Sequence, residues 1–429
     1  MIPRTRHFVA LLLLSVAIVL PAHSQSLAPV ITVNHGPNAP AQRAKHYVIL
    51  ISFDGFRYDY AERYNAQNVL ALAAHGASAP DGMIPSYPSF TFPNHYTLVT
   101  GLYPEHHGIV DNEFYDPTRK QVYSYKVKAT ETDGSWYGGT PLWVLAEQQG
   151  MRSASFFWPG SEANIQGVLP SYYLKFDDHF PNQKRIAQVL AWLRLPAAQR
   201  PHFITLYFSD TDHAGHNYGP DSPQTEAAVH ELDTELGRLM TGLKRLKLPV
   251  DIVVVADHGM VQVPPHWINL DQHGLDLSLL ENFQGTLLHA KSDTDAQKAF
   301  DQMQPGMPEY KVYRRTNVPE HLHFNENPRA GDPVIVPTGP YAIRAHDDPS
   351  KPRPNLGAHG FDPETVPEMK ALFVAAGPDI RTGVKVASFE NVSLYPLIAK
   401  ILGLDIRALK TGPIDGKLSV LQLILKKNR

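Results

Sequence analysis

Four continuous apolar runs along the chain predict strands that are buried on both faces of one sheet. They cover residues 46–53, 203–208, 250–256 and 371–376. A strand with one face in solvent alternates apolar and polar residues, whereas a strand covered by helices on both sides is apolar throughout. The four runs therefore indicate a mostly parallel sheet in the interior of the protein.

Helical patterns lie between these runs, most clearly at residues 68–74, 140–149 and 222–246. The last begins with Ser222-Pro223, a helix start signal, and repeats leucine or valine along one face. Strands that alternate with helices in this way predict an α/β sandwich.

Residues 262–354 break the alternation with short segments, much proline and one helical pattern at 295–303. We expect this stretch to form an inserted cap subdomain. The α/β core would then consist of residues 46–261 and 355–429. Residues 25–45 are rich in Pro, Ala and Asn, so we expect a flexible lead-in there.

The N-terminus has the pattern of a secretory signal peptide. Arg4 and Arg6 precede a run of 13 apolar residues, 8–20, and a small-x-small cleavage site follows at 22–24. The run is too short to span a membrane comfortably. We expect a signal peptide over residues 1–24 and a bacterial periplasmic or secreted protein with no membrane span after cleavage. The alternative is an uncleaved N-terminal anchor.

The composition narrows the chemistry that is open to the protein. The 429 residues include no cysteine, which excludes disulfides, thiolate nucleophiles, iron–sulfur clusters and cysteine zinc sites. Any metal must therefore bind His, Asp, Glu or a hydroxyl group. The net charge of −3 gives no support for a polyanion-binding surface, so we expect no stable nucleic-acid partner.

Side chains that can bind a metal follow three of the four predicted strands, and another lies beyond residue 355. The candidates are Asp54, Asp212, His216, Asp257, His258 and His359. In open α/β sheets, sites form at the carboxyl ends of the strands. Carboxylates mixed with imidazoles suit Zn²⁺ or Mn²⁺, and six ligands fit two ions better than one. Each Asp alone could equally mark a strand-end turn.

A threonine lies at the start of a further predicted helix. Thr91, with Pro93 close behind, has the pattern of a helix N-cap. The amino end of a helix favours a bound anion, and a threonine hydroxyl that touches zinc there would become a reactive alkoxide. The alternative is that Thr91 serves only as a cap.

The chain resembles the nucleotide pyrophosphatase/phosphodiesterase (NPP) family of the alkaline phosphatase superfamily. The resemblance rests on a set of motifs: Asp54-Gly55-Phe56-Arg57, Thr91-Phe92-Pro93-Asn94-His95-Tyr96, Thr100-Gly101-Leu102-Tyr103-Pro104, Trp158-Pro159-Gly160-Ser161, Asp212-x-x-Gly215-His216, Asp257-His258-Gly259-Met260 and Gly357-x-His359-Gly360. It implies an alkaline-phosphatase-like sandwich with a central, mostly parallel sheet flanked by helices.

The resemblance also implies roles for individual residues. Thr91 would be the nucleophile and form a covalent nucleotidylated intermediate. One of two zinc ions would be held by Asp54, Thr91, Asp257 and His258, and the other by Asp212, His216 and His359. Asn112 would bind a non-bridging phosphoryl oxygen together with the backbone N–H of Thr91.

Aromatic residues would define the substrate pocket. By resemblance, Phe92 and Tyr173 would sandwich a nucleobase and Tyr207 would line the same pocket. Tyr172 is the alternative to Tyr173, and packing within a strand is the alternative role of Tyr207. Phe90 stands where many family members carry a lysine, which removes a positive charge beside the nucleophile.

Together these residues imply a two-zinc hydrolase of nucleotide phosphodiester and pyrophosphate bonds that releases nucleoside 5′-monophosphates. One rival is a phosphodiesterase for lipid-derived choline or glycerol phosphodiesters, which would use the same metals. Others are a phosphomonoesterase and a zinc-binding protein without catalysis. The sequence makes no prediction of the oligomeric state.

Overall fold

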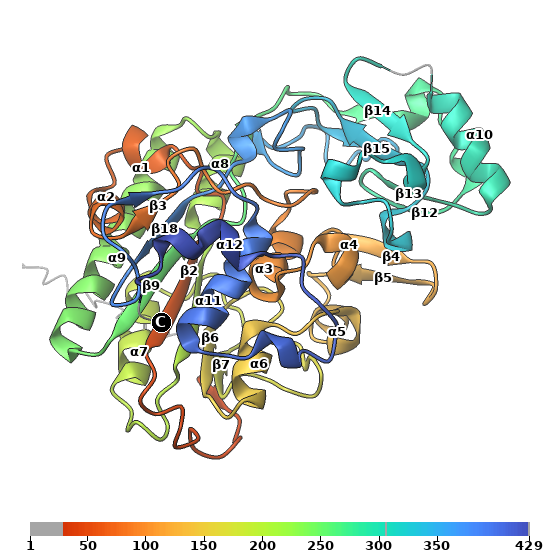
Figure 1. Cartoon of the computed structure of the whole chain (residues 1–429). Coiled ribbons are helices and arrows are strands. Elements are labelled where there is room, and N and C mark those ends of the chain that lie inside the picture. Colours follow the sequence, from red (N-terminus) through yellow and green to blue (C-terminus); the bar gives the residue numbers. More distant parts are fainter. Residues whose placement is uncertain (1–28, 305–306, 428–429) are drawn as a thin grey trace, which may run out of the picture.

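A nine-stranded mixed sheet forms the centre of the computed structural model, with helices on both of its faces (Figure 1). The structure describes residues 29–304 and 307–427, so the predicted signal peptide lies outside the described residues. Within these ranges, no helix is long and apolar enough to cross a bilayer.

Five parallel strands occupy the middle of the sheet, in the order β7 (Tyr172–Leu174), β6 (Ser153–Phe156), β8 (Phe203–Phe208), β2 (Tyr47–Phe53) and β9 (Val250–Val255). Every residue of β2, β8 and β9 is buried, as their continuous apolar sequences predict. Because these three neighbours run in parallel, their carboxyl ends meet at one edge of the sheet.

The remaining strands make the sheet mixed. Antiparallel β1 (Ile31–Thr32) pairs with β7, and antiparallel β18 (Phe373–Ala376) pairs with β9. Beyond β18 lie β3 (Ala77–Ser78) and β19 (Val384–Lys385). The expectation that 371–376 resembles the parallel strands is wrong in direction. The chain leaves β9 and returns at the same edge of the sheet, so its next strand must run away from that edge.

Two groups of helices cover the sheet. One group consists of α2 (Gln67–Ala74), α7 (Asn182–Leu193) and α9 (Pro223–Leu246), which pack together, with α1 (Tyr60–Arg63) and α8 (Asp210–Tyr218) beside them. The other consists of α3 (Thr91–Thr100), α6 (Leu142–Gln148) and α11 (Leu394–Leu402). Shorter helices are α4 (Pro104–His107), α5 (Lys128–Glu131) and α12 (Leu418–Leu421). Ser222 caps α9 as predicted, because its Oγ accepts the N–H of Thr225 at 3.1 Å.

The predicted insertion folds around a small core of its own, drawn in cyan at the upper right of Figure 1. Its sheet has the order β12 (Leu280–Gln284), β13 (Leu287–Ala290), β15 (Val334–Pro337) and β14 (Tyr310–Tyr313), with α10 (Asp293–Met303) against it. Short pairs join it to the core: β10 (Val261–Gln262) with β17 (Gly357–Ala358), and, next to them, β11 (Ile268–Asn269) with β16 (Ile343–Arg344). The hairpin of β4 (Glu113–Asp116) and β5 (Gln121–Ser124) lies below the insertion.

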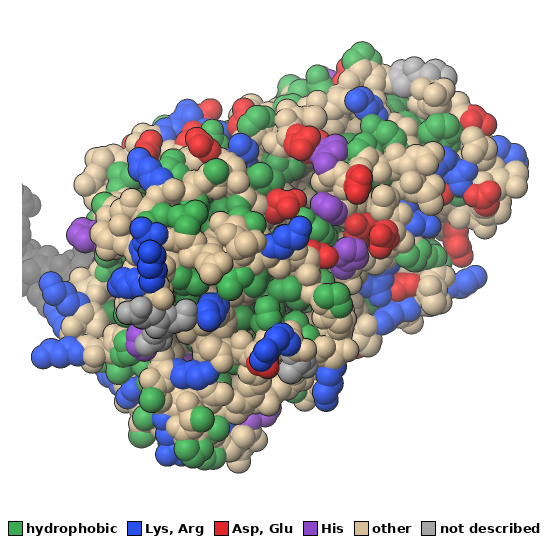
Figure 2. Space-filling model, viewed as in Figure 1, with side chains coloured by type: hydrophobic (Ala, Val, Ile, Leu, Met, Phe, Trp, Pro, Cys, Tyr) green, Lys and Arg blue, Asp and Glu red, His purple; other side chains and the backbone are tan. Residues whose placement is uncertain are grey.

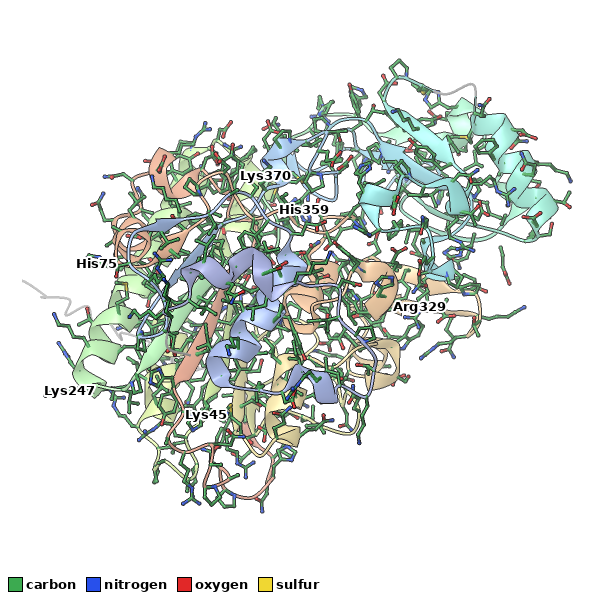
Figure 3. All side chains as sticks on the ribbon, in the orientation of Figure 1. Lys45, His75, Lys247, Arg329, His359 and Lys370 are labelled. Carbon is green, nitrogen blue, oxygen red and sulfur yellow. The ribbon has the colours of Figure 1, made fainter. Side chains whose placement is uncertain are left out.

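Arg329 fastens the insertion to the core (Figure 3). Its guanidinium donates to the carbonyl groups of Gly108 and Trp136 at 2.8 and 3.0 Å, and it pairs with Asp116 at 2.8 Å. These contacts join residues more than 190 positions apart in the sequence. The insertion is therefore held against the core by a half-buried charged group and not only by its two connections.

Residues 29–45 pack onto the core, which differs from the flexible lead-in expected. The side chain of Asn38 is fully buried and donates to the carbonyl groups of Ala197 and Arg200, while its Oδ1 accepts the N–H of Arg152. A composition rich in Pro and Ala does not reveal such contacts, because one buried amide supplies them.

Candidate metal centre

The predicted metal ligands meet at the carboxyl edge of the sheet. Asp54 directly follows β2, and Asp257 and His258 follow β9. Asp212 and His216 lie on α8, which follows β8, and His359 comes directly after β17. Each of the three parallel strands thus ends at the centre. The remaining candidate ligand, His359, comes from the segment where the chain returns from the insertion.

The first group of side chains surrounds Thr91. The Nε2 atom of His258 lies 3.4 Å from Asp54 Oδ1, 3.0 Å from Asp257 Oδ2 and 3.3 Å from Thr91 Oγ1. Asp54, Asp257 and His258 are all buried. The ends of two strands, β2 and β9, and the start of α3 therefore bring four candidate ligand atoms together.

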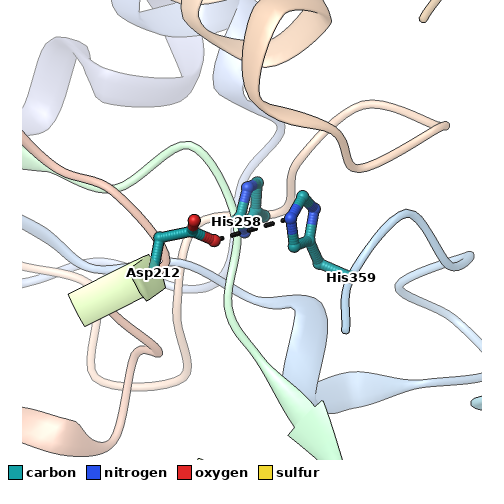
Figure 4. A group of neighbouring side chains, drawn as sticks. All are labelled: Asp212, His258 and His359. Carbon is teal, nitrogen blue, oxygen red and sulfur yellow. Dashed lines mark ion pairs between the residues drawn. The ribbon is translucent and has the colours of Figure 1, made fainter. Parts of the chain in front are cut away.

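The second group lies beside the first (Figure 4). Asp212 Oδ1 is 3.3 Å from His216 Nε2 and 3.5 Å from His359 Nε2, and these two nitrogens are 3.1 Å apart. The ring of His359 stacks on that of His258 with 3.5 Å between centroids. The two groups therefore form one continuous centre.

Both groups fit cations, because each contains a buried carboxylate oxygen that accepts no hydrogen bond from the described residues. Asp54 Oδ1, Asp212 Oδ1 and Asp257 Oδ2 are buried and have no hydrogen-bond partner among the described residues. Burial and the neighbouring carboxylates of Asp257 and Asp212 raise the pKa of Asp54 well above its ordinary value. A cation among clustered buried carboxylates of this kind would stabilise their ionised forms.

Backbone carbonyl groups orient the three imidazoles. The Nδ1–H of His216 donates to Gly357 O at 2.8 Å, that of His258 to Gly259 O at 2.8 Å and that of His359 to Ser89 O at 2.9 Å. Donation from Nδ1 leaves the lone pair on Nε2, which is the atom that faces the centre in each case. This is the arrangement that holds histidine ready to bind a metal.

Two further contacts fix the carboxylates. Tyr207 donates its hydroxyl hydrogen to Asp54 Oδ2 at 2.6 Å, and the N–H of Gly55 donates to Asp257 Oδ1 at 3.2 Å. Each contact uses the second oxygen of a carboxylate whose first oxygen points into the centre. Tyr207 therefore positions a candidate ligand in addition to lining the adjacent cavity.

Thr91 is the first residue of α3 and does not act as its N-cap, which corrects that expectation. The cap position belongs to Phe90, whose side chain makes no capping hydrogen bond. Asn112 supplies the missing acceptor from a distance, because its Oδ1 accepts the N–H of Phe92 at 2.8 Å. The hydroxyl of Thr91 is consequently free to face His258, and its own N–H, at the helix start, has no intrahelical acceptor.

His95 touches the first group directly. Its Nδ1 lies 2.9 Å from Thr91 O and 3.2 Å from Asp257 Oδ2, and its Nε2 lies 2.8 Å from Ser52 Oγ. His95 follows Thr91 by four residues on α3, so one turn of helix places it beneath the nucleophile candidate. This four-residue spacing between Thr91 and His95 is the sequence feature that could have predicted the contact.

A cavity of about 180 Å³ opens beside Thr91. Phe92, Asn112 and Tyr207 line it as predicted, and Tyr125 and Phe176 do so as well. The rings of Phe92 and Tyr125 lie 5.3 Å apart, and that of Phe176 lies 6.1 Å from Tyr207. The cavity is therefore an aromatic slot that ends at the metal centre.

Tyr173 does not line this cavity. It lies in β7, where it pairs with Ile31 of β1. The alternative, Tyr172, donates its hydroxyl to Gln199 O and stacks on Trp192, away from the cavity. Phe176 takes the place expected for Tyr173, because the chain turns toward the site only after β7 ends. Phe176 is 44% exposed, and its place two residues after β7 is the only hint that the sequence offers for it.

Comparisons with known proteins agree with the motifs and with the fold. The family described as type I phosphodiesterase / nucleotide pyrophosphatase matches residues 48–362. Human ectonucleotide pyrophosphatase/phosphodiesterase family member 1 is 35% identical over 382 residues, which are 86% of this chain and 41% of that protein. The chain thus spans about two fifths of that relative's length. An uncharacterized pyrophosphatase/phosphodiesterase of Schizosaccharomyces pombe is 34% identical, over 89% of this chain and 81% of the relative.

Among solved structures, murine ectonucleotide pyrophosphatase/phosphodiesterase 5 has the same fold. An inactive threonine-to-alanine variant of that protein, in complex with AMP, matches with a TM-score of 0.81 and 28% identity. The match covers 89% of this chain and all of that chain. The prediction of an α/β sandwich with a large central sheet is thereby confirmed. These findings show that the chain belongs to the type I phosphodiesterase/nucleotide pyrophosphatase family, a family of hydrolases in the alkaline phosphatase superfamily.

Proposed function

We propose that the protein hydrolyses nucleotide phosphodiester and pyrophosphate bonds and releases nucleoside 5′-monophosphates through a nucleotidylated Thr91. The observation that carries the proposal is the place of Thr91. Its hydroxyl lies at the start of α3, faces the first ligand group and borders the aromatic cavity. A nucleotide bound there would present its phosphorus to that hydroxyl.

Two zinc ions would be held by the two groups. Asp54, Thr91, Asp257 and His258 would hold one ion, and Asp212, His216 and His359 the other. When bound, zinc ions at such a centre lower the pKa of hydroxyl ligands and stabilise negative charge on phosphoryl and leaving oxygens. The unpartnered oxygens of Asp54, Asp212 and Asp257 support this assignment.

The protein itself stabilises the phosphoryl group with neutral donors. The N–H of Thr91 and the Nδ2 amide of Asn112 would donate to a non-bridging oxygen. Asn112 is oriented for this role because its Oδ1 is already occupied by the N–H of Phe92. Donors fixed before the substrate arrives stabilise developing charge without reorganisation.

The reaction would proceed in two successive displacements at phosphorus. Thr91 loses its proton to solvent, and its Oγ1 forms a bond to phosphorus while the bond to the leaving oxygen breaks and that oxygen departs with the electron pair. Water then attacks the same phosphorus, the bond to Oγ1 breaks, and Oγ1 regains a proton. The products are a nucleoside 5′-monophosphate and the leaving group.

The aromatic cavity supports a nucleotide substrate over a choline phosphodiester. Phe92, Tyr125 and Phe176 offer ring faces on which a base can stack. Two carboxylates of the cavity, Glu131 and Glu162, are already paired with Lys128 at 3.1 and 3.0 Å. The single ammonium group of Lys128 offsets part of the charge that these two carboxylates would offer to a quaternary ammonium group.

We further propose export to the periplasm or the cell exterior, on the sequence of residues 1–24. N-terminal sequencing of protein recovered from the periplasmic fraction tests this. A mature protein that begins close to residue 25 is expected, and an intact Met1 in the membrane fraction would indicate the anchor instead.

A hydrolysis panel tests the proposed function. It compares ATP, a nucleoside 5′-nitrophenyl phosphate, glycerophosphocholine and nitrophenyl phosphate, each with wild type, Thr91→Ala and Thr91→Ser. We expect the two nucleotides to be preferred, Thr91→Ala to be inactive while folded, and Thr91→Ser to keep part of the activity. Preference for glycerophosphocholine would favour the lipid-derived alternative, and near wild-type turnover of Thr91→Ala would exclude Thr91 as the nucleophile.

A further inference from the structure

A second and larger cavity lies on the other side of the metal centre, between the core and the insertion. Its volume is about 950 Å³, which is ample for a nucleotide. His216 and His359 form its inner end, and Phe90 lines it beside them. We call this cavity the insertion groove; its outer wall is formed by Trp267, Phe283, Tyr341, Lys351 and Arg353.

The metal centre separates the insertion groove from the aromatic cavity. Thr91 and Asp212 border the aromatic cavity, whereas His216 and His359, which contact Asp212, border the groove. In phosphoryl transfer the attacking and leaving oxygens lie roughly in line on opposite sides of phosphorus. A nucleotide whose phosphorus faces Thr91 from the aromatic cavity would therefore direct its leaving group past His216 and His359, into the groove.

Two basic side chains line the outer part of the groove, together with the acidic side chain of Asp348. Lys351 and Arg353 are exposed and, in the described part of the chain, form no ion pair. The backbone at Lys351 is nevertheless fixed, because Trp267 Nε1 and Arg344 Nη1 both donate to its carbonyl oxygen at 3.0 Å. Two cations on a tethered loop suit the phosphates of a leaving group.

The same groove presents aromatic faces. Trp267, Phe283 and Tyr341 are only half-buried, although Phe283 and Tyr341 pack against the apolar core of the insertion. Arg344 covers one face of Trp267, with 4.9 Å from its guanidinium carbon to the ring centroid. The ring of Phe283 makes an edge-on contact with that of His346, at 5.2 Å between centroids. Half-exposed rings of this kind can stack on a nucleobase.

We propose that the insertion groove binds the leaving half of a dinucleotide polyphosphate, with its phosphates at Lys351 and Arg353 and its second base against the aromatic wall. This rests on the proposed function, because it takes the hydrolysis at Thr91 as given. It adds a specificity determinant that belongs to the insertion and not to the core. The protein would accordingly favour substrates with a nucleotide on each side of the bond that breaks.

Three substrates with different leaving groups test the groove. The leaving group is a nucleotide in diadenosine tetraphosphate, pyrophosphate in ATP and nitrophenolate in a nucleoside 5′-nitrophenyl phosphate. For the double variant Lys351→Ala/Arg353→Ala, we expect the ratio of kcat/KM for the dinucleotide to that for the nitrophenyl ester to fall at least about tenfold. The matched control Lys244→Ala/Arg245→Ala removes two exposed cations from the end of α9 and should leave this ratio as in wild type.

A second variant tests the aromatic wall. Phe283→Leu keeps an apolar side chain but removes the ring, so we expect the preference for the dinucleotide over ATP to fall about tenfold, mainly through KM. Ratios that stay within twofold of wild type in both variants would overturn the proposal, and an unchanged dinucleotide-to-ATP ratio in Phe283→Leu would remove the second base from the groove. If wild type cleaves none of the three substrates, the proposed function fails instead.

Discussion

At the scale of single residues, the side-chain amide of Asn112 has two roles, one for its oxygen and one for its NH2 group. Its oxygen completes the start of α3 by accepting the N–H of Phe92, and its amide group is the proposed donor to the phosphoryl group. Loss of one such donor costs about 10²–10³ in kcat. We expect Asn112→Ala to lose activity to this extent and also to lower the free energy of unfolding.

Asn112→Asp separates these two effects. The carboxylate keeps the acceptor for Phe92 but replaces the donor with a negative charge that repels phosphate. We therefore expect Asn112→Asp to be at least as inactive as Asn112→Ala while it loses less stability in urea denaturation. Equal stability loss with wild-type turnover in either variant would contradict both roles.

A surface histidine couples stability to pH. Histidine and acidic side chains gather on one face of the molecule, near the boundary between the core and the insertion (Figure 2). His106 pairs with Asp415 at 2.8 Å and with Glu326 of the insertion at 3.5 Å. The hydrogen bond to Asp415 raises the pKa of His106 to about 9, although partial burial opposes it. A raised pKa means that the pair stabilises the fold fully below the unfolded value of about 6.5 and loses that contribution as pH rises through 9.

The measurement is urea denaturation at several pH values between 6 and 10. We expect the difference in free energy of unfolding between wild type and His106→Gln to shrink across that range. Asp415→Asn, which removes the partner, should show the same trend. A difference that stays constant with pH would exclude the coupling.

At the scale of elements, a single glycine lets β2 and α8 approach closely enough to share the metal centre. Gly55 has a φ of 68°, and a Cβ atom there would lie 3.0 Å from the Cα of Asp212. Both the backbone conformation and the close approach favour glycine. We expect Gly55→Ala to cost about 1–3 kcal/mol in stability and to impair activity by displacing Asp212.

Gly167→Ala is the matched control. Gly167 has a similar φ of 77°, but a Cβ atom there would meet nothing within 4 Å. It should therefore show only the cost of the left-handed backbone and retain full activity. The same loss of activity in both variants would show that strain alone, and not the approach to Asp212, explains the effect.

Elements with a strong local signal could be predicted from the sequence almost to the residue. Continuous apolar residues mark β2 and β9, and Ser222 with an apolar stripe marks α9. The direction of β18 could not be predicted, because a continuous apolar run does not indicate whether a strand is parallel or antiparallel to its neighbour. It follows from where the chain returns from the insertion, which is a property of the whole path.

The metal centre was easier to anticipate than the aromatic cavity for a related reason. Ligands such as Asp54 and Asp257 directly follow buried strands, so the sheet itself brings them together. Phe176 reaches the cavity through an irregular segment after β7, where no repeating pattern fixes the direction of a side chain. The resemblance to the family therefore suggested Tyr173, three residues too early.

At the scale of the whole molecule, the centre joins parts of the chain that are far apart in the sequence. Its residues run from Asp54 to His359, and one end of that range follows the insertion. Bound ions would therefore stabilise the core as a unit. An ion present at 1,000 times its dissociation constant contributes about 4 kcal/mol to the free energy of unfolding.

Metal removal tests this coupling. We expect chelation to abolish activity and to lower the melting temperature of wild type, and zinc to restore both. In Asp212→Asn the second group loses a ligand, so chelation should change the melting temperature less. Full activity after exhaustive chelation would contradict the metal assignment.

The stereochemical course at phosphorus tests the central claim most directly. A nucleotide phosphorothioate diester of known configuration at phosphorus is cleaved in ¹⁸O-labelled water, and the configuration of the product is determined. Two in-line displacements, first by Thr91 and then by water, give net retention. We expect retention, and net inversion would mean that water attacks the substrate directly and that Thr91 is not the nucleophile.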